Sequence, residues 1–198
     1  MKIVSINVAS VANLFDAAPG QHTVKTGIHK QPVSGAVQVT RMGMRGDEQA
    51  DLSLHGGLEK AVYAYPAEHY AFWDAHRSAS RKRGVAEAAL APGAMGENLT
   101  LTGLLETEVW IGDRLQVGSA LLQVSEPRNP CFKFNVKIGL PHGAKLMVQS
   151  GFSGFYLRVV EAGSIVAGDA IELLPGVRDV TLSSLHERRR TGRQYDLF

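Results

Sequence analysis

Apolar and polar side chains alternate over several short stretches of the chain, and glycine or proline residues separate these stretches. Residues 2–8 alternate in this way and predict a half-buried strand. Residues 35–41 do so as well, with two valines on one face, and a shorter strand is expected near residues 24–28. The longest run, residues 108–125, predicts a hairpin that turns at Gly118-Ser119. The pattern therefore predicts a mostly β protein.

Helical patterns are fewer. Residues 66–78 begin with proline, which the first turn of a helix tolerates, and carry aromatic residues in an amphipathic arrangement. Residues 143–149 predict a short helix, and residues 182–193 predict a helix whose arginine-rich end is solvated. Gly-Asp precedes a short apolar strand at residues 112–113 and again at 168–169, which indicates one turn used twice in a single architecture. Many short strands with few helices favour a closed or nearly closed β-barrel.

Composition narrows the class of protein. The chain has 198 residues, of which 44% are hydrophobic and 20% charged, as expected for one globular domain. A net charge of +2 is too small to argue for nucleic-acid binding. No apolar run reaches the length of a membrane span and the N-terminus does not resemble a signal peptide, so we expect a cytoplasmic protein. We predict a barrel domain over residues 1–176 and a short C-terminal helix or tail over residues 177–198.

The single cysteine, Cys131, lies in an unusual segment and excludes intrachain disulfides and cysteine-rich zinc sites. Two prolines, Pro127 and Pro130, restrict the backbone before it and present the thiol just past a strand. Arg128 and Lys133 flank it, and nearby cations favour the thiolate, the form that attacks electrophiles and binds metals. The alternative is a small buried apolar side chain, the commonest role of a lone free cysteine. The segment favours a functional thiol.

A glycine pair gives a second candidate site. His55-Gly56-Gly57 allows the backbone to approach a ligand closely, and successive N–H groups in such a turn can bind an anion. Lys60, three residues further on, could supply a counter-charge to phosphate. A plain glycine turn with a surface lysine is the alternative, and the segment alone slightly favours it. Gly96-Glu97-Asn98 places a carboxylate and an amide at the entry to a strand, where an amide cap on a turn is the simpler explanation.

Several common catalytic motifs are missing from the sequence. No two histidines have the spacing that places two imidazoles on one helix face, so a histidine zinc site is not expected. The chain has no Gly-x-Ser-x-Gly elbow, no Gly-x-Gly-x-x-Gly after a strand and no Walker-type lysine loop. A metal that arrives with its own cofactor and is bound by the thiolate remains open.

In order and spacing, these segments resemble the MOSC family, the domain shared with the C-terminal part of molybdenum cofactor sulfurases, and most of all its stand-alone bacterial YiiM-like branch. The matching pieces, in chain order, are residues 25–30, 46–62, 96–99, 111–113, 127–131 and 168–169. Members of that branch often carry a helical extension after the barrel, whereas only residues 177–198 follow it here.

The resemblance implies a single-domain MOSC-type β-barrel, of the pyruvate-kinase-barrel-like kind, that binds the molybdenum cofactor, a pterin with a dithiolene and a terminal phosphate. Cys131 would be the thiolate ligand of molybdenum, and Arg128 would contact the pterin or stabilise the thiolate. These two are the candidate catalytic residues. The candidate cofactor-binding residues, chosen by polarity and motif position, are Lys30, His55, Gly56, Gly57, Lys60, Asn98, Lys133 and Asn135.

The family's enzymatic members reduce N-hydroxylated compounds, including hydroxylamino bases, so the resemblance implies a molybdenum-dependent oxidoreductase with a small-molecule substrate. The chain has no flavin, haem or iron–sulfur motif, and we therefore expect a separate electron-donating reductase as partner. The alternative is a carrier that holds the cofactor, or sulfur bound to the cysteine, without turnover. Pyridoxal phosphate is not expected, and the oligomeric state stays open, a dimer included.

Overall fold

Short strands and four α-helices form a single, mostly β domain in the computed structural model, which describes residues 1–15, 23–52, 56–80 and 88–191. The strands are β1 (Lys2–Val8), β2 (Ala12–Asn13), β3 (Lys25–Thr26), β4 (Gln31–Val33), β5 (Val37–Thr40), β6 (Gly43–Met44), β7 (Val62–Pro66), β8 (Leu99–Thr102), β9 (Arg114–Val117), β10 (Ala120–Pro127), β11 (Phe155–Glu161), β12 (Gly163–Ile165) and β13 (Ile171–Leu174). The α-helices are α1 (Tyr70–Ala79), α2 (Phe132–Ile138), α3 (Gly143–Ser150) and α4 (Leu182–Thr191), and the 3-10 helices are η1 (Leu58–Lys60), η2 (Ala67–His69) and η3 (Glu106–Glu108).

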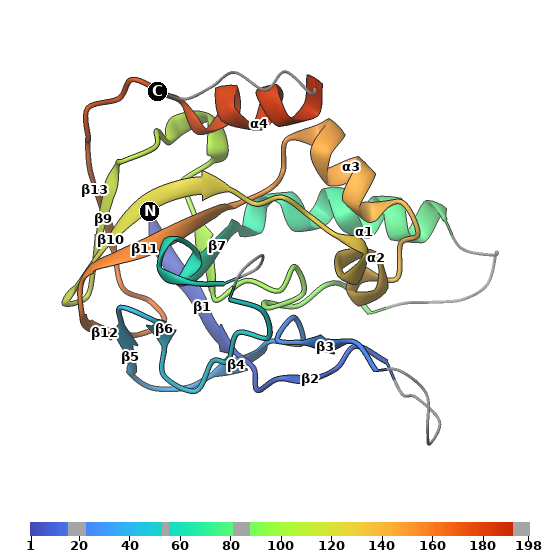
Figure 1. The fold of residues 1–198 in the computed structure, drawn as a ribbon, viewed down its shortest axis with the longest axis horizontal. Coiled ribbons are helices and arrows are strands. Elements are labelled where there is room, and N and C mark those ends of the chain that lie inside the picture. The colour runs from blue at the N-terminus through green and yellow to red at the C-terminus, as the bar shows by residue number, and fades with distance from the viewer. Residues whose placement is uncertain (16–22, 53–55, 81–87, 192–198) are drawn as a thin grey trace.

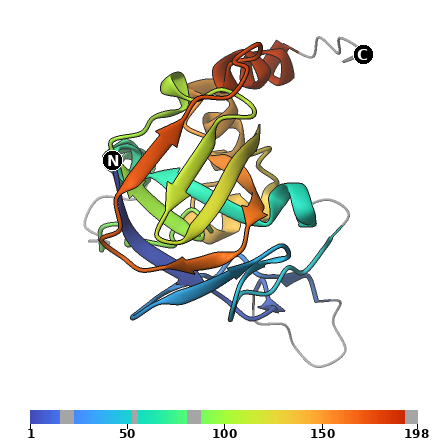
Figure 2. The ribbon, with the colours of Figure 1, turned by 90° about the vertical axis from the view of Figure 1, so that its left-hand side faces the viewer.

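Eight strands form the main sheet in the order β13-β9-β10-β11-β7-β8-β1-β4. Neighbours pair antiparallel except β7 and β8, which run parallel. A three-stranded sheet, β12-β5-β6, and the β2–β3 pair complete the β structure. The main sheet is strongly curved, and its strands bend around a shared interior (Figure 2). Helices α1, α2 and α3 gather at one side of the sheet, and α4 lies at another edge near the C-terminus (Figure 1).

The predicted barrel closure is not confirmed. Among the strands of the described residues, the order of the main sheet has two ends, β13 and β4. Backbone hydrogen bonds nevertheless join β1 to the turn before β13: the Ile3 N–H donates to the Asp169 carbonyl (2.9 Å) and the Gly168 N–H donates to the Ile3 carbonyl (2.8 Å). The sheet therefore curves far enough for β1 to contact the β13 side, without a continuous ladder there.

Two hydrophobic clusters hold the domain together. The larger one fills the interior of the curved sheet and includes Ile6, Leu101, Leu122 and Leu157, each at most 1% exposed. The smaller one lies between β7 and the helices α1, α2 and α3, with Tyr65, Trp73, Phe134 and Met147 at its centre. This second cluster fixes α2, and with it the segment that carries Cys131, against the sheet.

The alternation of polar and apolar residues predicted several elements correctly. The strand expected at residues 2–8 is β1, and the hairpin expected in residues 108–125 is β9–β10, where Val117 pairs with Ala120 across Gly118-Ser119. The expected helices at residues 66–78, 143–149 and 182–193 correspond to η2 with α1, to α3 and to α4. The short helix α2 and the buried strand β7 were not predicted.

The repeated Gly-Asp turn is confirmed. In both copies the glycine has a positive φ, 90° at Gly112 and 101° at Gly168. In both, the aspartate N–H donates to the carbonyl three residues earlier at 3.1 Å. The carboxylate accepts the N–H of that same residue, at 3.1 Å from Trp110 and 2.8 Å from Val166. The strands that follow the two turns, β9 and β13, pair with each other.

Residues 177–191 pack onto the rest of the domain. Leu182, in the first turn of α4, is 1% exposed and belongs to the larger core cluster. His186 contacts the Val148 carbonyl through Nε2 at 2.9 Å, which joins α4 to α3. None of the helices in the described ranges is long and apolar enough to cross a membrane.

Candidate functional site

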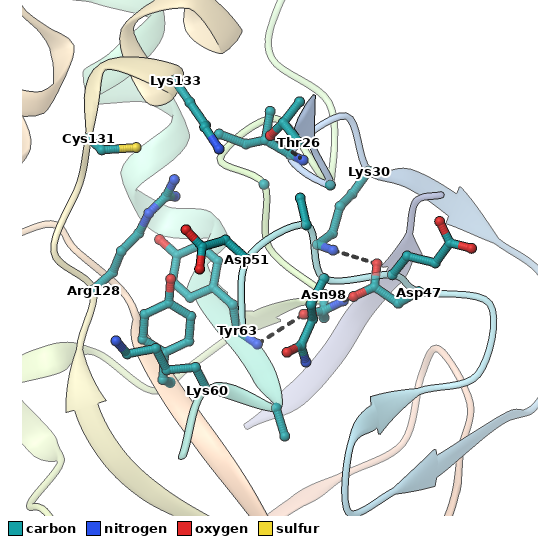
Figure 3. A pocket seen from close by; sticks show the side chains of 18 of the residues that line it. Thr26, Lys30, Asp47, Asp51, Lys60, Tyr63, Asn98, Arg128, Cys131 and Lys133 are labelled. Atoms are coloured by element: carbon teal, nitrogen blue, oxygen red, sulfur yellow. Dashed lines mark hydrogen bonds and ion pairs between the residues drawn. The ribbon is translucent and has the colours of Figure 1, made fainter. Parts of the chain in front are cut away.

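A cavity of about 100 Å³ lies where the start of α2 faces β3 and the loop after β6. It has room for several water-sized groups. Cys131, Arg128 and Lys133 occupy one side of it, and Lys30, Asp47 and Asn98 occupy the other (Figure 3). Its floor includes Tyr63 of β7 and Tyr156 of β11, which pair across the sheet. The cavity thus brings together residues that are more than a hundred positions apart.

Cys131 is held at the cavity by the local backbone. Strand β10 ends at Pro127, and Cys131 is the extended residue immediately before α2, with φ −125° and ψ 179°. Its side chain lines the cavity and is partly exposed. A buried apolar role, the alternative from sequence, would have placed the thiol in a core cluster. The placement instead leaves the thiol accessible to a ligand.

Arg128 is held beside Cys131 and is only 7% exposed, which is unusual for a charged side chain. Its guanidinium carbon lies 4.8 Å from the centre of the Tyr63 ring and 4.9 Å from that of Phe134, and Nη1 donates to the Met95 carbonyl. Burial opposes the charge, but the Tyr63 and Tyr156 oxygens and the Cys131 sulfur outweigh it and raise the pKa of the guanidinium. Arg128 is therefore a permanent positive charge next to the thiol.

Lys30 supplies a second positive charge from the opposite wall, and it is 7% exposed. Burial lowers its pKa below the ordinary lysine value, and the ion pair with Asp47 partly offsets this effect. Asp47 also accepts hydrogen bonds from the Ala9 N–H (2.9 Å) and from Asn98 Nδ2 (2.9 Å). These contacts leave Lys30 with a defined position at the cavity wall.

The other predicted cations also reach the cavity. Lys133 lines it and donates through Nζ to the Lys25 carbonyl at 2.9 Å, which ties α2 to β3. Lys60 lines it from η1 and lies 3.5 Å from Glu126. Three carboxylates lie in the same lining: Asp47, Glu48 and Asp51. The lining therefore combines four cations, those of Arg128 and three lysines, with three carboxylates.

Asn98 lines the cavity, but its amide is engaged in the fold. Oδ1 accepts the Tyr63 N–H at 3.1 Å, and Nδ2 donates to the Asn7 carbonyl as well as to Asp47. Asn135 does not line the cavity: its Oδ1 accepts the Ala144 N–H at 2.7 Å between α2 and α3.

The two glycines of the predicted anion turn lie beside the cavity and not in its lining. Gly57 has φ 89°, a conformation that favours glycine, and its N–H donates to Gln49 Oε1 at 2.7 Å. A Cβ at Gly56 would meet the same Gln49 oxygen at 2.3 Å. Both glycines therefore pack against the 47–52 loop. His55 lies outside the described residues.

Sequence reasoning missed Asp47, Asp51, Tyr63 and Tyr156 as site residues. Both tyrosines reach the cavity only because β7 and β11 pair, which no local pattern reveals. Burial raises the pKa of Tyr63 well above that of a free tyrosine, so its hydroxyl stays protonated and donates to the Ser153 carbonyl at 2.7 Å. The carboxylates could have been found as the acidic residues of the segment that precedes the glycine pair.

The chemistry of the lining fits an anionic ligand that carries a soft metal. Thiolate sulfur suits such metals, and lysine and arginine side chains suit phosphate. Among the residues that the structure describes, no three His, Cys, Asp or Glu side chains are grouped to hold a metal ion alone. The thiol and the cations of the lining are therefore suited to a ligand that brings its own metal and carries negative charge.

Comparison with known proteins gives a consistent picture. Three curated relatives align over about three quarters of the chain: "Uncharacterized protein YflK" of Bacillus subtilis (44% identity over 76% of this chain), "Protein YiiM" of Escherichia coli (41% over 78%) and a protein named "Reductase" of Gibberella moniliformis (40% over 76%). The aligned stretches span 64%, 66% and 26% of those proteins' own lengths, so the chain covers less than two thirds of each.

A solved structure and a family model agree with these relatives. The crystal structure of YiiM from Geobacillus stearothermophilus superposes with a TM-score of 0.75 and 33% identity, over 98% of this chain and 86% of that one. The MOSC domain model matches residues 51–172, which include Cys131 and most of the main sheet. The chain belongs to the MOSC domain family, in its YiiM-like branch.

Proposed function

We propose that this protein binds the molybdenum cofactor in the cavity at Cys131 and reduces N-hydroxylated small molecules such as hydroxylamino bases. The observation that carries the proposal is the pairing of an accessible thiol with a buried, fixed guanidinium in a cavity lined by three lysines. Family membership supports the cofactor, and the relative named "Reductase" supports the type of reaction.

Each side chain of the cavity has a role in this proposal. The Cys131 thiolate is the protein's ligand to molybdenum, and Arg128 balances the negative charge beside it. Lys30, Lys60 and Lys133 bind the anionic part of the cofactor. When bound, the cofactor supplies the two-electron chemistry. Asn98 acts indirectly, because its amide holds the β7 backbone and Asp47 in place.

The reaction consumes two electrons and two protons: the N–O bond breaks, one proton joins the hydroxyl oxygen, which leaves as water, and the other proton is taken up by the nitrogen to give the amine. The sequence contains no flavin, haem or iron–sulfur motif, and we therefore propose that a separate electron-donating reductase supplies the electrons. The matched stretch is about a quarter of the length of the Gibberella protein.

The test is to produce the protein in a host that makes the cofactor and to compare it with Cys131→Ser. We expect the wild-type protein to contain molybdenum and pterin and to reduce a hydroxylamino purine when a reductase supplies electrons. Cys131→Ser should lose the molybdenum–thiolate spectroscopic signal and at least about a hundredfold in rate, because the hydroxyl does not replace a soft thiolate ligand.

Two lysines on neighbouring helices give a matched control. Lys133→Ala should reduce cofactor retention, whereas Lys145→Ala, at an exposed position of α3 outside the cavity lining, should not. A wild-type protein that contains the cofactor but shows no turnover with any competent donor contradicts the reductase and supports a carrier. Equal cofactor content in wild type and Cys131→Ser, with unchanged spectra, contradicts the ligand role of Cys131.

A further inference from the structure

Glu97 is a carboxylate with no exposed surface, and it organises the turn that precedes β8. Its Oε1 accepts the Gly93 N–H (2.7 Å) and the Thr100 hydroxyl (2.7 Å), together with the Tyr70 hydroxyl. Its Oε2 accepts the Met95 N–H at 3.0 Å. The carboxylate therefore ties the two ends and the middle of residues 93–97 to one another, and to α1 and β8.

The same turn contacts the cavity on two sides. The Met95 carbonyl accepts the hydrogen bond from Arg128 Nη1. Gly93 and Gly96, both at positive φ, pack closely against the segment that carries Lys30. A Cβ at Gly93 would lie 2.7 Å from the Lys30 carbonyl oxygen, and a Cβ at Gly96 would lie 2.6 Å from Ile28 Cγ1. Residues 93–97 thus connect the wall that carries Arg128 with the wall that carries Lys30.

We infer that Glu97 is a positioning residue, which holds the Met95 carbonyl so that Arg128 stays beside Cys131. The Met95 N–H bound by Glu97 and the Met95 carbonyl bound by Arg128 belong to the two peptide groups that flank a single residue. A shift of the carboxylate contact therefore moves the acceptor of the guanidinium. The inference concerns the geometry of the cavity and stands or falls independently of the proposed reductase activity.

The substitution Glu97→Gln tests the contact selectively. The amide oxygen can take the place of Oε1, where three donors converge, and this leaves the amide NH₂ facing the Met95 N–H. Two donors then face each other, and the bond between the side chain and Met95 is lost. The side-chain shape stays almost the same, but the substitution also removes a negative charge that acts on Lys30 at the cavity. Loss of that charge alone would raise the local positive potential, so a fall in this potential reports displacement of Arg128.

The readout uses the fact that Cys131 is the only cysteine. We would measure the rates of its alkylation by iodoacetate, an anion, and by iodoacetamide, which is neutral, in the cofactor-free protein at one pH. Both reagents attack the same thiolate, so the ratio of the two rates reports the local positive potential and not the ionisation of the thiol. Displacing Arg128 should lower this ratio about fivefold, the size of one nearby charge in a water-accessible site.

Glu106 offers a matched control, because it is also a buried carboxylate (6% exposed) that accepts a backbone N–H, from Gly154 at 2.7 Å, but does not line this cavity. We expect Arg128→Gln to lower the ratio most and Glu97→Gln to lower it less, because the guanidinium is displaced and not removed. The double variant should show no larger fall than Arg128→Gln alone, and Glu106→Gln should leave the ratio unchanged. Melting temperatures show that the variants are folded.

Three results would overturn the inference: an unchanged ratio in folded Glu97→Gln, an equal fall in Glu106→Gln, or an additional fall in the double variant. If Glu97→Gln does not fold, Glu97→Asp takes its place. That variant keeps the charge but is one methylene shorter, so it cannot reach the donors of both its oxygens, and the same fall in the ratio is expected.

Discussion

At the scale of single residues, Lys30 shows how burial and an ion pair act in opposite directions on the pKa of one side chain. It is 7% exposed, and burial lowers its pKa below 10.5 although Asp47 favours the charged form. A lysine whose pKa is lower in the folded state releases its proton first in that state. Between the folded pKa and 10.5, the unfolded chain therefore binds more protons, and stability due to this group rises with pH.

The direction in which stability changes with pH can be measured by comparing the wild type with Lys30→Met. This substitution removes the titrating group and keeps the length of the side chain. We expect the free energy of unfolding of the wild type, relative to that of Lys30→Met, to increase as pH rises from neutrality toward 10.5. Urea unfolding at a series of pH values gives both curves. Curves that run parallel, or a wild type that loses stability relative to the variant, would contradict the lowered pKa.

At the scale of elements, the two Gly-Asp turns have the same geometry but different surroundings. Asp113 has no exposed surface, and beyond its own turn it accepts the Gly176 N–H at 2.8 Å and Arg178 Nε at 3.2 Å. Asp169 is partly exposed, and its carboxylate accepts the Val166 N–H of its own turn. The carboxylate of the first turn therefore joins distant parts of the chain, whereas the carboxylate of the second caps its own turn.

We predict that Asp113→Ala lowers the free energy of unfolding by about 3 kcal/mol, because buried N–H groups and a cation lose their acceptor. Asp169→Ala should cost about 1 kcal/mol, the usual effect of a lost cap on an accessible turn. Chemical denaturation of both variants measures the difference. Equal losses would mean that the longer-range contacts of Asp113 contribute nothing to stability.

The elements that sequence reasoning predicted are those with a local signature. Strand β1 alternates exposed and buried residues over residues 2–5, and the β9–β10 turn has a glycine at its first position. Strand β7 is buried at all five positions, so it has no alternation to detect. Helix α2 has only seven residues, about two turns, which is too short for an amphipathic pattern to stand out, and it starts directly after Pro130-Cys131.

The need for a local signature also limits how much of the site can be predicted from sequence. Cys131, Arg128, Lys30, Lys60 and Lys133 could be chosen because charge, proline spacing and family resemblance single them out along the chain. The aromatic contacts that fix Arg128 could not, since they require the β7–β11 pairing and the position of α2. Asn135 looked equivalent to Asn98 in sequence, yet the packing of α3 against α2 takes its amide away from the cavity.

At the scale of the whole molecule, the cavity combines two parts of the chain. The family model matches residues 51–172, which supply Cys131, Arg128 and the tyrosines. Thr26, Lys30 and Asp47 precede that range and form the opposite wall. The first fifty residues are therefore as necessary to the cavity as the matched domain, and β1, in the main sheet, connects the two parts.

Residues 177–191 also pack into this single unit, and substitution can test how much they stabilise it. Leu182 is 1% exposed in the larger core cluster, and its N–H donates to the Val109 carbonyl at 3.0 Å. Leu182→Ala should lower the free energy of unfolding by about 3 kcal/mol, or the melting temperature by roughly 6 to 12 °C. Val177→Ala is the matched control, because Val177 is 85% exposed and its truncation should change stability by less than about 0.5 kcal/mol. If α4 were a dispensable appendage, the two variants would melt together and residues 1–176 would fold alone; we expect instead that removing residues 177–198 leaves core leucines exposed and the domain unfolded.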